Sequence, residues 1–230
     1  MPAPVVPAHI GIIPDGNRRW AKGRGLPALE GHRQGVKVAK EIALASFERG
    51  VQYLTMYGFS AENWSRAQDE VSYLMDLYYQ LLKYELKALF KRGVRFRFLG
   101  SRHGLPEKLL QVIDEAEART AGNANGTLSL CLNYGGHEEV AAAVRSLLAE
   151  GVTPEGVTPE VIAQHLYAPE LPPVDLIVRS SGEQRLSGFM LWRSTYAEFY
   201  FHNKHWPDFT VADLEAALTE YAQRQRRFGG

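Results

Sequence analysis

The sequence predicts an α/β fold with one domain, built on a mostly parallel central sheet flanked by helices. Short apolar segments alternate with amphipathic helical segments along the chain, the pattern of strands joined by crossover helices. Segments such as 11–13 and 176–178 are apolar without interruption, as expected of strands covered on both faces. The 230 residues, 45% of them hydrophobic, can fill one core, and no repeat or low-complexity linker divides them.

Five apolar segments are predicted strands because each is short and is bounded by polar or turn-forming residues. They are residues 9–14, 51–59, 94–99, 127–134 and 175–179, and 197–201 is a further aromatic strand. Helical periodicity predicts helices at 30–49, 70–91, 106–121, 138–150 and 211–226. Thr210 is the expected N-cap of the last helix, and residues 150–159 are expected to form a surface connection between two helices.

Charge and cysteine content narrow the function classes. Lys and Arg together number 26, as do Asp and Glu together, so the basic excess typical of nucleic-acid-binding proteins is missing. Cys131 is the single cysteine, expected to be a small buried residue in a reducing compartment. The chain has no signal-peptide pattern and no apolar run near the ~20 residues of a membrane span, so we expect a cytoplasmic protein. P-loop, dinucleotide-binding, nucleophile-elbow and zinc-protease motifs are also missing.

A polar cluster, Asp-Gly-Asn-Arg-Arg-Trp at residues 15–20, directly follows the first predicted strand. In open parallel sheets, ligands collect beyond the carboxyl ends of the strands. Gly16 allows the backbone to approach a ligand, and Arg18 and Arg19 supply positive charge for an anion. Asp15 is suited to a divalent cation that also touches a diphosphate. A solvated Asp-Gly turn would explain the same residues, so this cluster alone leaves the choice open.

A second polar cluster follows the strand at 51–59 and contains Ser60, Glu62, Asn63, Trp64 and Arg66. A helix N-terminus would explain Ser60 as a cap and Glu62 as a favourable charge near the helix dipole. That reading gives no reason for Asn63 beside Arg66, which favours a binding site. A third cluster at 133–137 has two glycines suited to a tight turn from strand to helix, and we expect it to be mainly structural.

A fourth cluster, at 178–188, combines arginines, serines and glycines in a way that suits a phosphate nest. Shortly after it, Glu198 places one carboxylate in an otherwise apolar strand. A buried, unpaired carboxylate is costly unless it binds a partner or a metal, whereas a Glu on an edge strand can face water. The sequence favours a functional role for Glu198 and leaves the edge strand as the alternative.

Taken in order, these motifs resemble the cis-prenyltransferase family, also called undecaprenyl diphosphate synthases or isoprenyl transferases. They are Asp-Gly-Asn-x-Arg-Trp-Ala, Gly-His, Phe-Ser-x-Glu-Asn-Trp, Asn-Tyr-Gly-Gly, Asp-Leu-x-x-Arg-x-x-Gly-Glu-x-Arg and Trp-Pro-Asp-Phe. The resemblance extends from residues 9–10 to 226–230. It implies an enzyme that condenses isopentenyl diphosphate onto an allylic diphosphate, farnesyl or geranyl diphosphate, and releases diphosphate. The expected product is a Z-polyprenyl diphosphate of the undecaprenyl type, a precursor of a cell-wall lipid carrier.

The resemblance also implies Mg²⁺ as cofactor, a hydrophobic tunnel for the growing chain, a homodimer, and membrane contact only through the lipid product. Asp15 would be catalytic and hold Mg²⁺ with Glu198, and Asn63 would take part in proton removal. The residues implied to bind the two substrates are Gly16, Asn17, Arg18, Arg19, Trp20, His32, Ser60, Ala61, Glu62, Trp64, Arg66, Arg179, Arg185, Leu186 and Ser187. Trp20 would line the entrance, and Arg227-Phe228-Gly229 would reach the neighbouring subunit's site.

The apolar stripe on the helix at 70–91 fits ordinary core packing, and the resemblance makes it one wall of the tunnel. Gly58 would leave room near the tunnel mouth and so favour a longer product. Ala28 replaces an arginine common in the family, which removes one diphosphate contact unless Arg24 or Arg33 compensates. Arg193 stands where glutamine is frequent. Two alternatives remain: an enzyme of the same fold that makes short or branched prenyl diphosphates, and a non-catalytic partner subunit.

Overall fold

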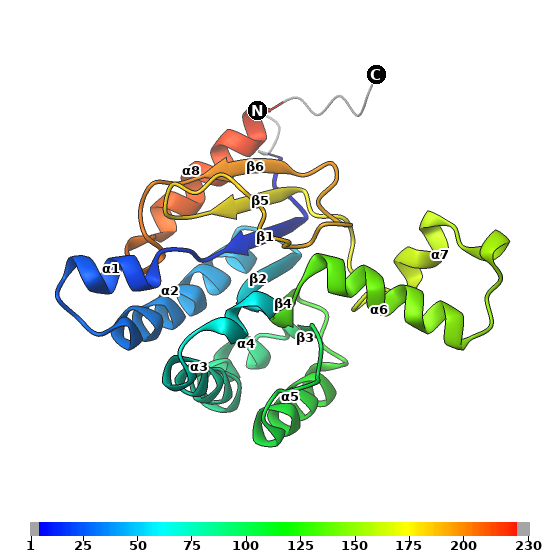
Figure 1. Ribbon diagram of the computed structural model, residues 1–230. Coiled ribbons are helices and arrows are strands. Elements are labelled where there is room, and N and C mark those ends of the chain that lie inside the picture. The colour runs from blue at the N-terminus through cyan, green and yellow to red at the C-terminus, as the bar shows by residue number, and fades with distance from the viewer. Residues whose placement is uncertain (1–4, 225–230) are drawn as a thin grey trace.

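Six parallel strands form the central sheet of the computed structural model, which describes residues 5–224 (Figure 1). Their order across the sheet is β3-β4-β2-β1-β5-β6, and every neighbouring pair is parallel. The strands are β1 (His9–Ile13), β2 (Tyr53–Ser60), β3 (Arg95–Leu99), β4 (Thr127–Tyr134), β5 (Leu176–Arg179) and β6 (Glu198–Phe201). The predicted strands and the parallel sheet are therefore confirmed, with ends that differ by one or two residues.

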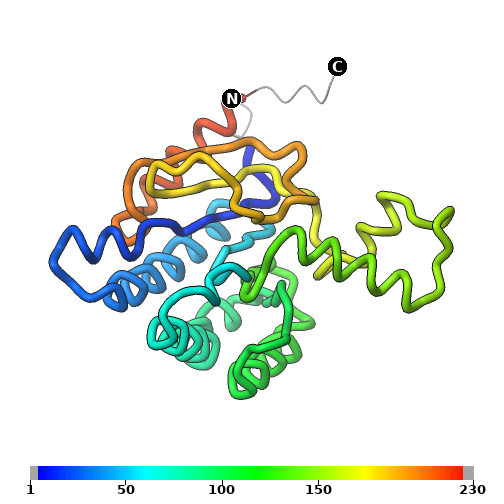
Figure 2. Tube along the Cα trace, viewed as in Figure 1, coloured from blue at the N-terminus to red at the C-terminus, as the bar shows by residue number. Residues whose placement is uncertain are grey.

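The sheet reverses its direction of growth at β1. After β1 the chain builds β2, β3 and β4 on one side, then crosses to β5 and β6 on the other. Figure 2 shows the first strand, in blue, between the cyan chain of β2 and the yellow chain of β5. Such a switch point opens a crevice at the carboxyl ends of the strands, and Asp15 lies just beyond β1 at this place.

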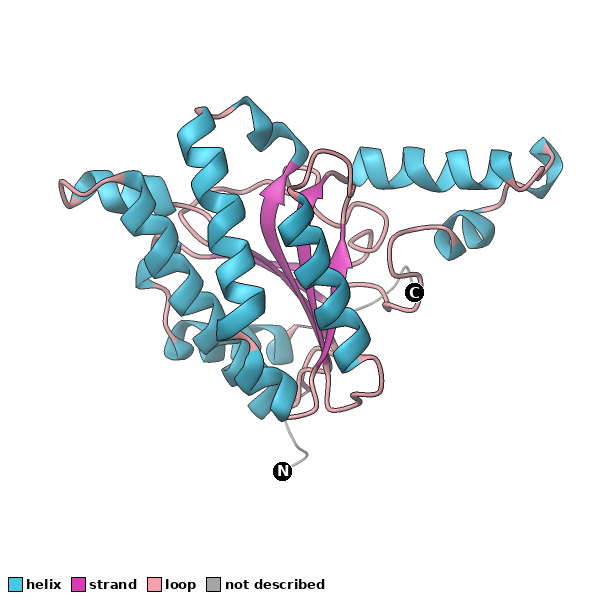
Figure 3. Cartoon of the chain, turned by 90° about the horizontal axis from the view of Figure 1, so that it is seen from below, coloured by secondary structure: helices cyan, strands magenta, loops and turns pink. Residues whose placement is uncertain are grey.

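The helices are α1 (Asn17–Gly23), α2 (Ala28–Glu48), α3 (Gln68–Gln80), α4 (Lys87–Lys91), α5 (Glu107–Thr120), α6 (Gly136–Ala149), α7 (Pro159–Gln164) and α8 (Val211–Gln223). The larger core lies between one face of the sheet and the inner sides of α2, α3, α5 and α8. Figure 3, a view from below, shows helices in front of the strands. In Figure 1, α6 projects from the rest of the molecule. None of the helices in residues 5–224 is long and apolar enough to cross a membrane.

The second face of the sheet departs from the expectation of helices on both sides. Ile13, Tyr57 and Ile177 on that face pack against Leu171 and Phe189, which come from stretches of turns rather than from helices. The periodicity of these stretches is weak, so sequence patterning could not place them. Cys131 is fully buried in this second core, as predicted, and burial raises the pKa of its thiol.

Two helical predictions are corrected. The segment 70–91 is not one helix: α3 ends at Gln80, a π-helical turn occupies Leu81–Glu85, and α4 follows. The cluster after β1 is not only a loop, because Asn17–Gly23 forms the short helix α1. Its polar sequence carries no apolar stripe, and packing on α2 stabilises it instead. The Thr210 cap of α8 is confirmed, with its hydroxyl accepting from the Asp213 backbone N–H.

Gly58 sits at an irregularity in β2 where the pairing with β4 shifts between Tyr57 and Phe59. A Cβ at this position would lie 2.8 Å from Leu132 Cδ2 and 3.2 Å from the Cys131 carbonyl oxygen. The glycine is therefore required by close packing at a β-bulge. Gly58 also lines the cavity, so the interpretation that it leaves room for a product stays a prediction.

Candidate active site

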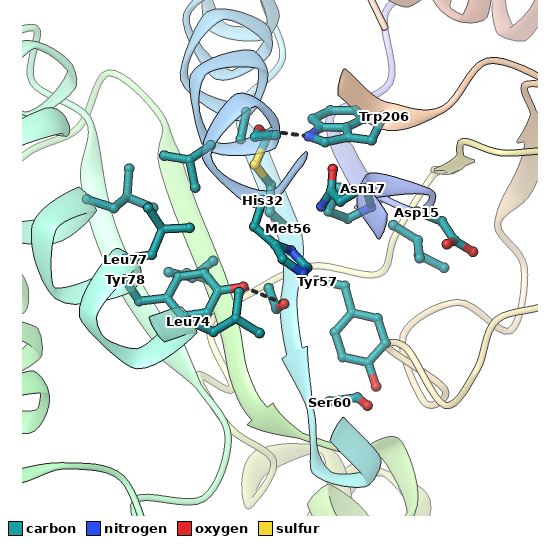
Figure 4. Close-up of a pocket in the computed structure, with 18 of the residues that line it drawn as sticks. Asp15, Asn17, His32, Met56, Tyr57, Ser60, Leu74, Leu77, Tyr78 and Trp206 are labelled. Carbon is teal, nitrogen blue, oxygen red and sulfur yellow. Dashed lines mark hydrogen bonds between the residues drawn. The ribbon is translucent and has the colours of Figure 1, made fainter. Parts of the chain in front are cut away.

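One cavity of about 540 Å³ opens at the carboxyl ends of β1, β2 and β5 and runs inward between α2, α3 and the sheet. Its mouth is polar and its interior is apolar, as the close-up in Figure 4 shows, with Asp15 at one end and Leu77 at the other. The mouth is lined by Asp15, Asn17, His32, Ser60, Glu62, Asn63, Arg66, Arg179 and Ser187. A second hollow, also lined by Gly16, Arg18, Arg19, Lys22 and Ala28, adjoins this mouth.

Asp15 is held between two arginines. Its Oδ1 accepts from Arg19 at 3.1 Å and its Oδ2 from Arg179 at 2.8 Å, while Ser180 Oγ bonds both its backbone N–H and its carbonyl. Partial burial alone would raise the pKa of Asp15, but the hydrogen bonds and charges of Arg179 and Arg19 outweigh it and hold that pKa below its usual value. The carboxylate is therefore ionised throughout the neutral range.

Arg179 is the buried cation of the mouth. Only 4% of its surface is exposed, and its guanidinium donates to Asp15, to Ser187 Oγ at 2.9 Å and to the Arg185 carbonyl. The Arg185 side chain is more than half exposed and pairs with Glu183, which also accepts from Arg19 at 2.7 Å. The arginines of the first and fourth clusters thus meet across the carboxyl edge of the sheet.

Gly16 and Asn17 differ from ordinary loop residues in their backbone geometry and hydrogen bonding, respectively. Gly16 has φ of 97°, and a Cβ there would lie 2.5 Å from Ser181 Oγ. Asn17 Oδ1 is buried and has no hydrogen-bond partner among the described residues, although it lines the cavity. An unpaired buried amide costs free energy, so it indicates a position completed by a polar ligand or water.

Glu70 does not line the cavity, but it contacts three basic residues of the mouth and the adjoining hollow, and the sequence did not mark it as a site residue. It is 8% exposed, and its carboxylate accepts from His32 Nε2 at 3.1 Å and from Arg66 at 3.0 Å, with Arg18 at 3.7 Å. Burial lowers the pKa of His32 although Glu70 acts in the opposite direction, so the imidazole is neutral. Arg66 precedes α3 and Glu70 lies in its first turn, four residues later. This spacing brings two side chains together and could have predicted the contact from the sequence.

Ser60 and Asn63 form a capping box at the short 3₁₀ helix Ala61–Ser65. The Asn63 Oδ1 accepts from the Ser60 backbone N–H at 3.1 Å, and the Ser60 side chain caps the helix in return. The helix-terminus interpretation therefore accounts for Asn63 as well, contrary to our expectation. Asn63 still lines the cavity, although its Oδ1 accepts the hydrogen bond from Ser60.

Five predicted substrate-binding residues do not line the cavity or the adjoining hollow: Trp20, Ala61, Trp64, Arg185 and Leu186. The Trp20 indole donates to Asp208 at 2.7 Å and stacks under Arg24, so it faces away from the entrance it was expected to line. The Trp64 indole donates to Asn133 Oδ1 at 2.7 Å. Asn133 also donates to two loop carbonyls, which agrees with a structural role for the third cluster.

Glu198 lies at the opposite end of the sheet from Asp15. It begins β6, an edge strand, in register with Leu176 at the start of β5, and it pairs with Arg224 at 2.8 Å. The two carboxylates predicted to share a metal are therefore not brought together within one chain. The predicted strand at 197–201 already put Glu198 near its amino end, and the parallel pairing of β6 with β5 sets that end opposite the carboxyl edge where Asp15 lies. The family's C-terminal motif at 227–229 lies outside the described residues.

The acidic groups of the mouth suit Mg²⁺ only if the substrate's diphosphate supplies further ligands. Among residues 5–224, no group of three or more His, Cys, Asp and Glu side chains is arranged to hold a metal ion. Mg²⁺ is commonly held by one or two carboxylates together with substrate phosphates and water. Asp15 is ionised and its side chain is 25% exposed, so it suits a Mg²⁺ that arrives with a diphosphate.

The chain matches the family model described as "Putative undecaprenyl diphosphate synthase" over residues 13–229. It is 46% identical to an isoprenyl transferase of Thermotoga maritima over 98% of this chain and 97% of that protein. Its fold is similar to lavandulyl diphosphate synthase from Lavandula x intermedia, solved with dimethylallyl diphosphate (TM-score 0.94, 37% identity, 98% and 99% of the two chains). A probable undecaprenyl diphosphate synthase from Campylobacter jejuni gives a TM-score of 0.82 at 28% identity, over 97% and 99% of the chains. The chain belongs to the cis-prenyltransferase family of prenyl-transferring enzymes.

Proposed function

We propose that this protein condenses isopentenyl diphosphate onto an allylic diphosphate, with farnesyl or geranyl diphosphate as primer, and releases diphosphate. The observation that carries the proposal is one cavity that joins an arginine-rich mouth with an ionised carboxylate to an apolar interior. A prenyl diphosphate has this same division into an anionic head and an apolar tail. The intact set of Asp15, Arg19, Arg66 and Arg179 also argues against a non-catalytic partner subunit.

In the proposed reaction, negative charge develops on the diphosphate leaving the allylic primer. That group would bind at the hollow beside the mouth, where Gly16 allows the backbone to approach it and Asn17 offers an amide. Arg18 and Arg19 would supply guanidinium contacts, with His32 close by. Mg²⁺ would neutralise part of this charge, with Asp15 as its protein ligand. An incoming diphosphate would compete for Arg19 and Arg179 and so leave Asp15 oxygens available.

The second diphosphate, that of isopentenyl diphosphate, would bind to Arg179, Arg185 and Ser187. Arg179 and Ser187 line the same mouth, and the Arg185 side chain is exposed beside it, so two diphosphates bound there would hold the double bond of one substrate near the allylic carbon of the other. The new C–C bond leaves a proton to be removed. A neutral amide is too weak a base to take the proton itself, so we assign the Asn63 amide to orient a diphosphate oxygen or water as the acceptor, with its Oδ1 already accepting from the Ser60 N–H.

The finer features of the activity remain proposals as well. We propose a Z-polyprenyl product of the undecaprenyl type, in line with the description of the family model that the chain matches. We also propose a homodimer. Because Glu198 lies far from Asp15 of its own chain, its proposed role at a metal site requires the partner chain. A cytoplasmic location agrees with the single, buried and unpaired Cys131.

A second candidate is an enzyme with a short product, favoured by the likeness to lavandulyl diphosphate synthase. One assay separates the two: the purified protein is incubated with Mg²⁺, labelled isopentenyl diphosphate and dimethylallyl, geranyl or farnesyl diphosphate. Repeated incorporation with farnesyl or geranyl diphosphate would support chain elongation. A single condensation that stops with dimethylallyl diphosphate would support the short product, and no incorporation with any primer would overturn both.

A further inference from the structure

The loop that follows β5 is anchored to the rest of the molecule at three consecutive residues. The Ser187 carbonyl oxygen lies 3.2 Å from the Tyr57 hydroxyl of β2. The Gly188 carbonyl accepts from the backbone N–H of Gly136 at 2.8 Å. The fully buried ring of Phe189 stacks on the Tyr57 ring, with the two ring centroids 4.9 Å apart. Tyr57 therefore provides two of the three anchors.

The backbone of this loop needs such anchors. Ser187 has φ of 50°, in the left-handed region that is unfavourable for a residue with a Cβ, and Met190 has φ of 49°. A conformation of this kind persists only where surrounding contacts hold it. The direction of the Ser187 side chain therefore depends on what its backbone is bound to.

Ser187 in turn bears on the buried cation of the mouth. Its Oγ accepts from the Arg179 guanidinium at 2.9 Å, and both residues line the cavity, as Tyr57 does. Ser187 and Arg179 are two of the groups to which we assign the diphosphate of isopentenyl diphosphate. A displaced Ser187 would remove one of these groups and release a hydrogen bond that orients the other.

The Tyr57 side chain suits this task because its ring is fixed and its hydroxyl is protonated. The ring also lies edge-on to that of Tyr134, with centroids 5.9 Å apart and an interplanar angle of 88°. The hydroxyl is 3.2 Å from the Tyr134 carbonyl as well, so it shares one proton between the carbonyls of Tyr134 and Ser187. Burial raises the pKa of Tyr57 well above its usual value, so the hydroxyl stays a donor in the neutral range. In Figure 4 this hydroxyl points toward Ser60 at the end of β2.

We propose that Tyr57 is a positioning residue for isopentenyl diphosphate: its hydroxyl holds the Ser187 backbone, and so keeps Ser187 Oγ and Arg179 in place for the second diphosphate. The inference rests on the proposed function. Tyr57 itself takes no part in the bond-forming step, and its effect on the substrate passes through Ser187.

The test is Tyr57→Phe, which removes the hydroxyl and keeps the ring contacts with Phe189 and Tyr134. The KM for isopentenyl diphosphate is measured with labelled substrate and Mg²⁺ at a saturating allylic primer, and the KM for the primer is measured in the converse experiment. We expect the KM for isopentenyl diphosphate to rise about threefold to tenfold, the factor that corresponds to one neutral hydrogen bond. The KM for the primer should be unchanged, and circular dichroism checks that the variant folds.

A double-variant cycle tests whether the effect passes through Ser187. Ser187→Ala removes the hydroxyl that Tyr57 is proposed to position, so Tyr57→Phe should raise the KM for isopentenyl diphosphate much less in that variant than in the parent. Equal factors in the two backgrounds would show that Tyr57 acts independently of Ser187 and would overturn the inference.

Tyr53→Phe is the matched control, because Tyr53 lies in the same strand, packs against the same second core and does not line the cavity. It should keep both KM values of the parent. An unchanged KM for isopentenyl diphosphate in Tyr57→Phe, or an equal rise of both KM values, contradicts the positioning role. A parent that incorporates no label with any primer would instead overturn the proposed function, so the two failures are distinguishable.

Discussion

At the scale of single residues, Asp15 combines the features that the proposed chemistry needs. It lies at the switch point of the sheet, contacts two arginines and is ionised. Asp15→Asn keeps its shape and removes its charge, so we expect turnover to fall at least about 100-fold through loss of charge stabilisation at the leaving group. Steady-state incorporation measures this, with circular dichroism as the check on folding.

Asp208→Asn is the control for Asp15→Asn, because Asp208 pairs with Arg24 and Trp20 outside the cavity. It should retain turnover. Near-normal turnover in Asp15→Asn would reject the role of Asp15 in metal binding and ionisation.

Ala28 is the second residue at which the proposed binding of the primer can be tested. It is the first residue of α2 and lines the hollow beside the mouth. Neither expected substitute lines the hollow: Arg24 pairs with Asp208, and Arg33 pairs with Glu30. Ala28→Arg would add a charge-assisted hydrogen bond of about 1.5–3 kcal/mol, so we expect the KM for the allylic substrate to fall at least about tenfold.

Kinetics with each substrate varied in turn test this prediction. The KM for isopentenyl diphosphate should change less, because its proposed site lies at Arg179 and Arg185. An unchanged allylic KM would mean that Lys22, which lines the same hollow, already supplies the contact.

At the scale of elements, the segments covering the second face of the sheet depend on a buried ion pair. Arg193 donates to Glu139 of α6 at 2.8 Å and to the carbonyls of Tyr167 and Ala168, and the Tyr134 hydroxyl donates to Glu139 as well. Both charged side chains are at most 5% exposed. These contacts account for an arginine at this position, because it joins α6 to two stretches of turns.

Breaking that pair from one side should be costly. Arg193→Met leaves the Glu139 charge buried without its partner, so we expect the free energy of unfolding to drop by about 3–5 kcal/mol in urea titrations. Glu139→Gln/Arg193→Met removes both charges and keeps an acceptor for Tyr134, and it should recover much of that loss. Equal losses in the single and double variants would show that the hydrogen bonds of Arg193, not the charge pair, stabilise these segments.

At the scale of the whole molecule, His9 links stability to pH. It is fully buried in β1, with Nδ1 donating to the Pro172 carbonyl and Nε2 accepting from the Thr55 hydroxyl. Burial lowers its pKa from 6.5 to about 4, although the bond to Pro172 acts in the opposite direction. Between these two pH values the unfolded chain binds a proton that the folded chain excludes, so stability falls as the pH is lowered.

The expected loss from His9 between pH 7 and pH 4 is on the order of 3 kcal/mol. Urea unfolding at several pH values measures this loss. In His9→Gln, the free energy of unfolding lost between pH 7 and pH 4 should be smaller by that amount. A slope equal to that of the parent would show that other groups, such as His32, account for the acid sensitivity.

Most of the fold could be predicted from the sequence, because the information is local. Apolar runs such as 127–134 and the cap at Thr210 follow from side-chain periodicity and hydrogen bonding within a few residues. The polar clusters after β1, β2 and β5 could be assigned to the carboxyl edge for the same reason. The π-turn at Leu81–Glu85 could not, since the apolar stripe of that segment fits an uninterrupted helix equally well.

The sequence by itself determined the α/β class, the family motifs and the cluster from Asp15 to Arg19. The tertiary structure decided which of the polar side chains share one cavity: it turned Trp20 toward Asp208, placed Glu198 at the far end of the sheet and set Glu70 against His32 beside the mouth. The reason is physical. Strand and helix formation depend on neighbours in sequence, whereas the direction of a side chain at the end of a strand depends on packing against segments far away in the chain.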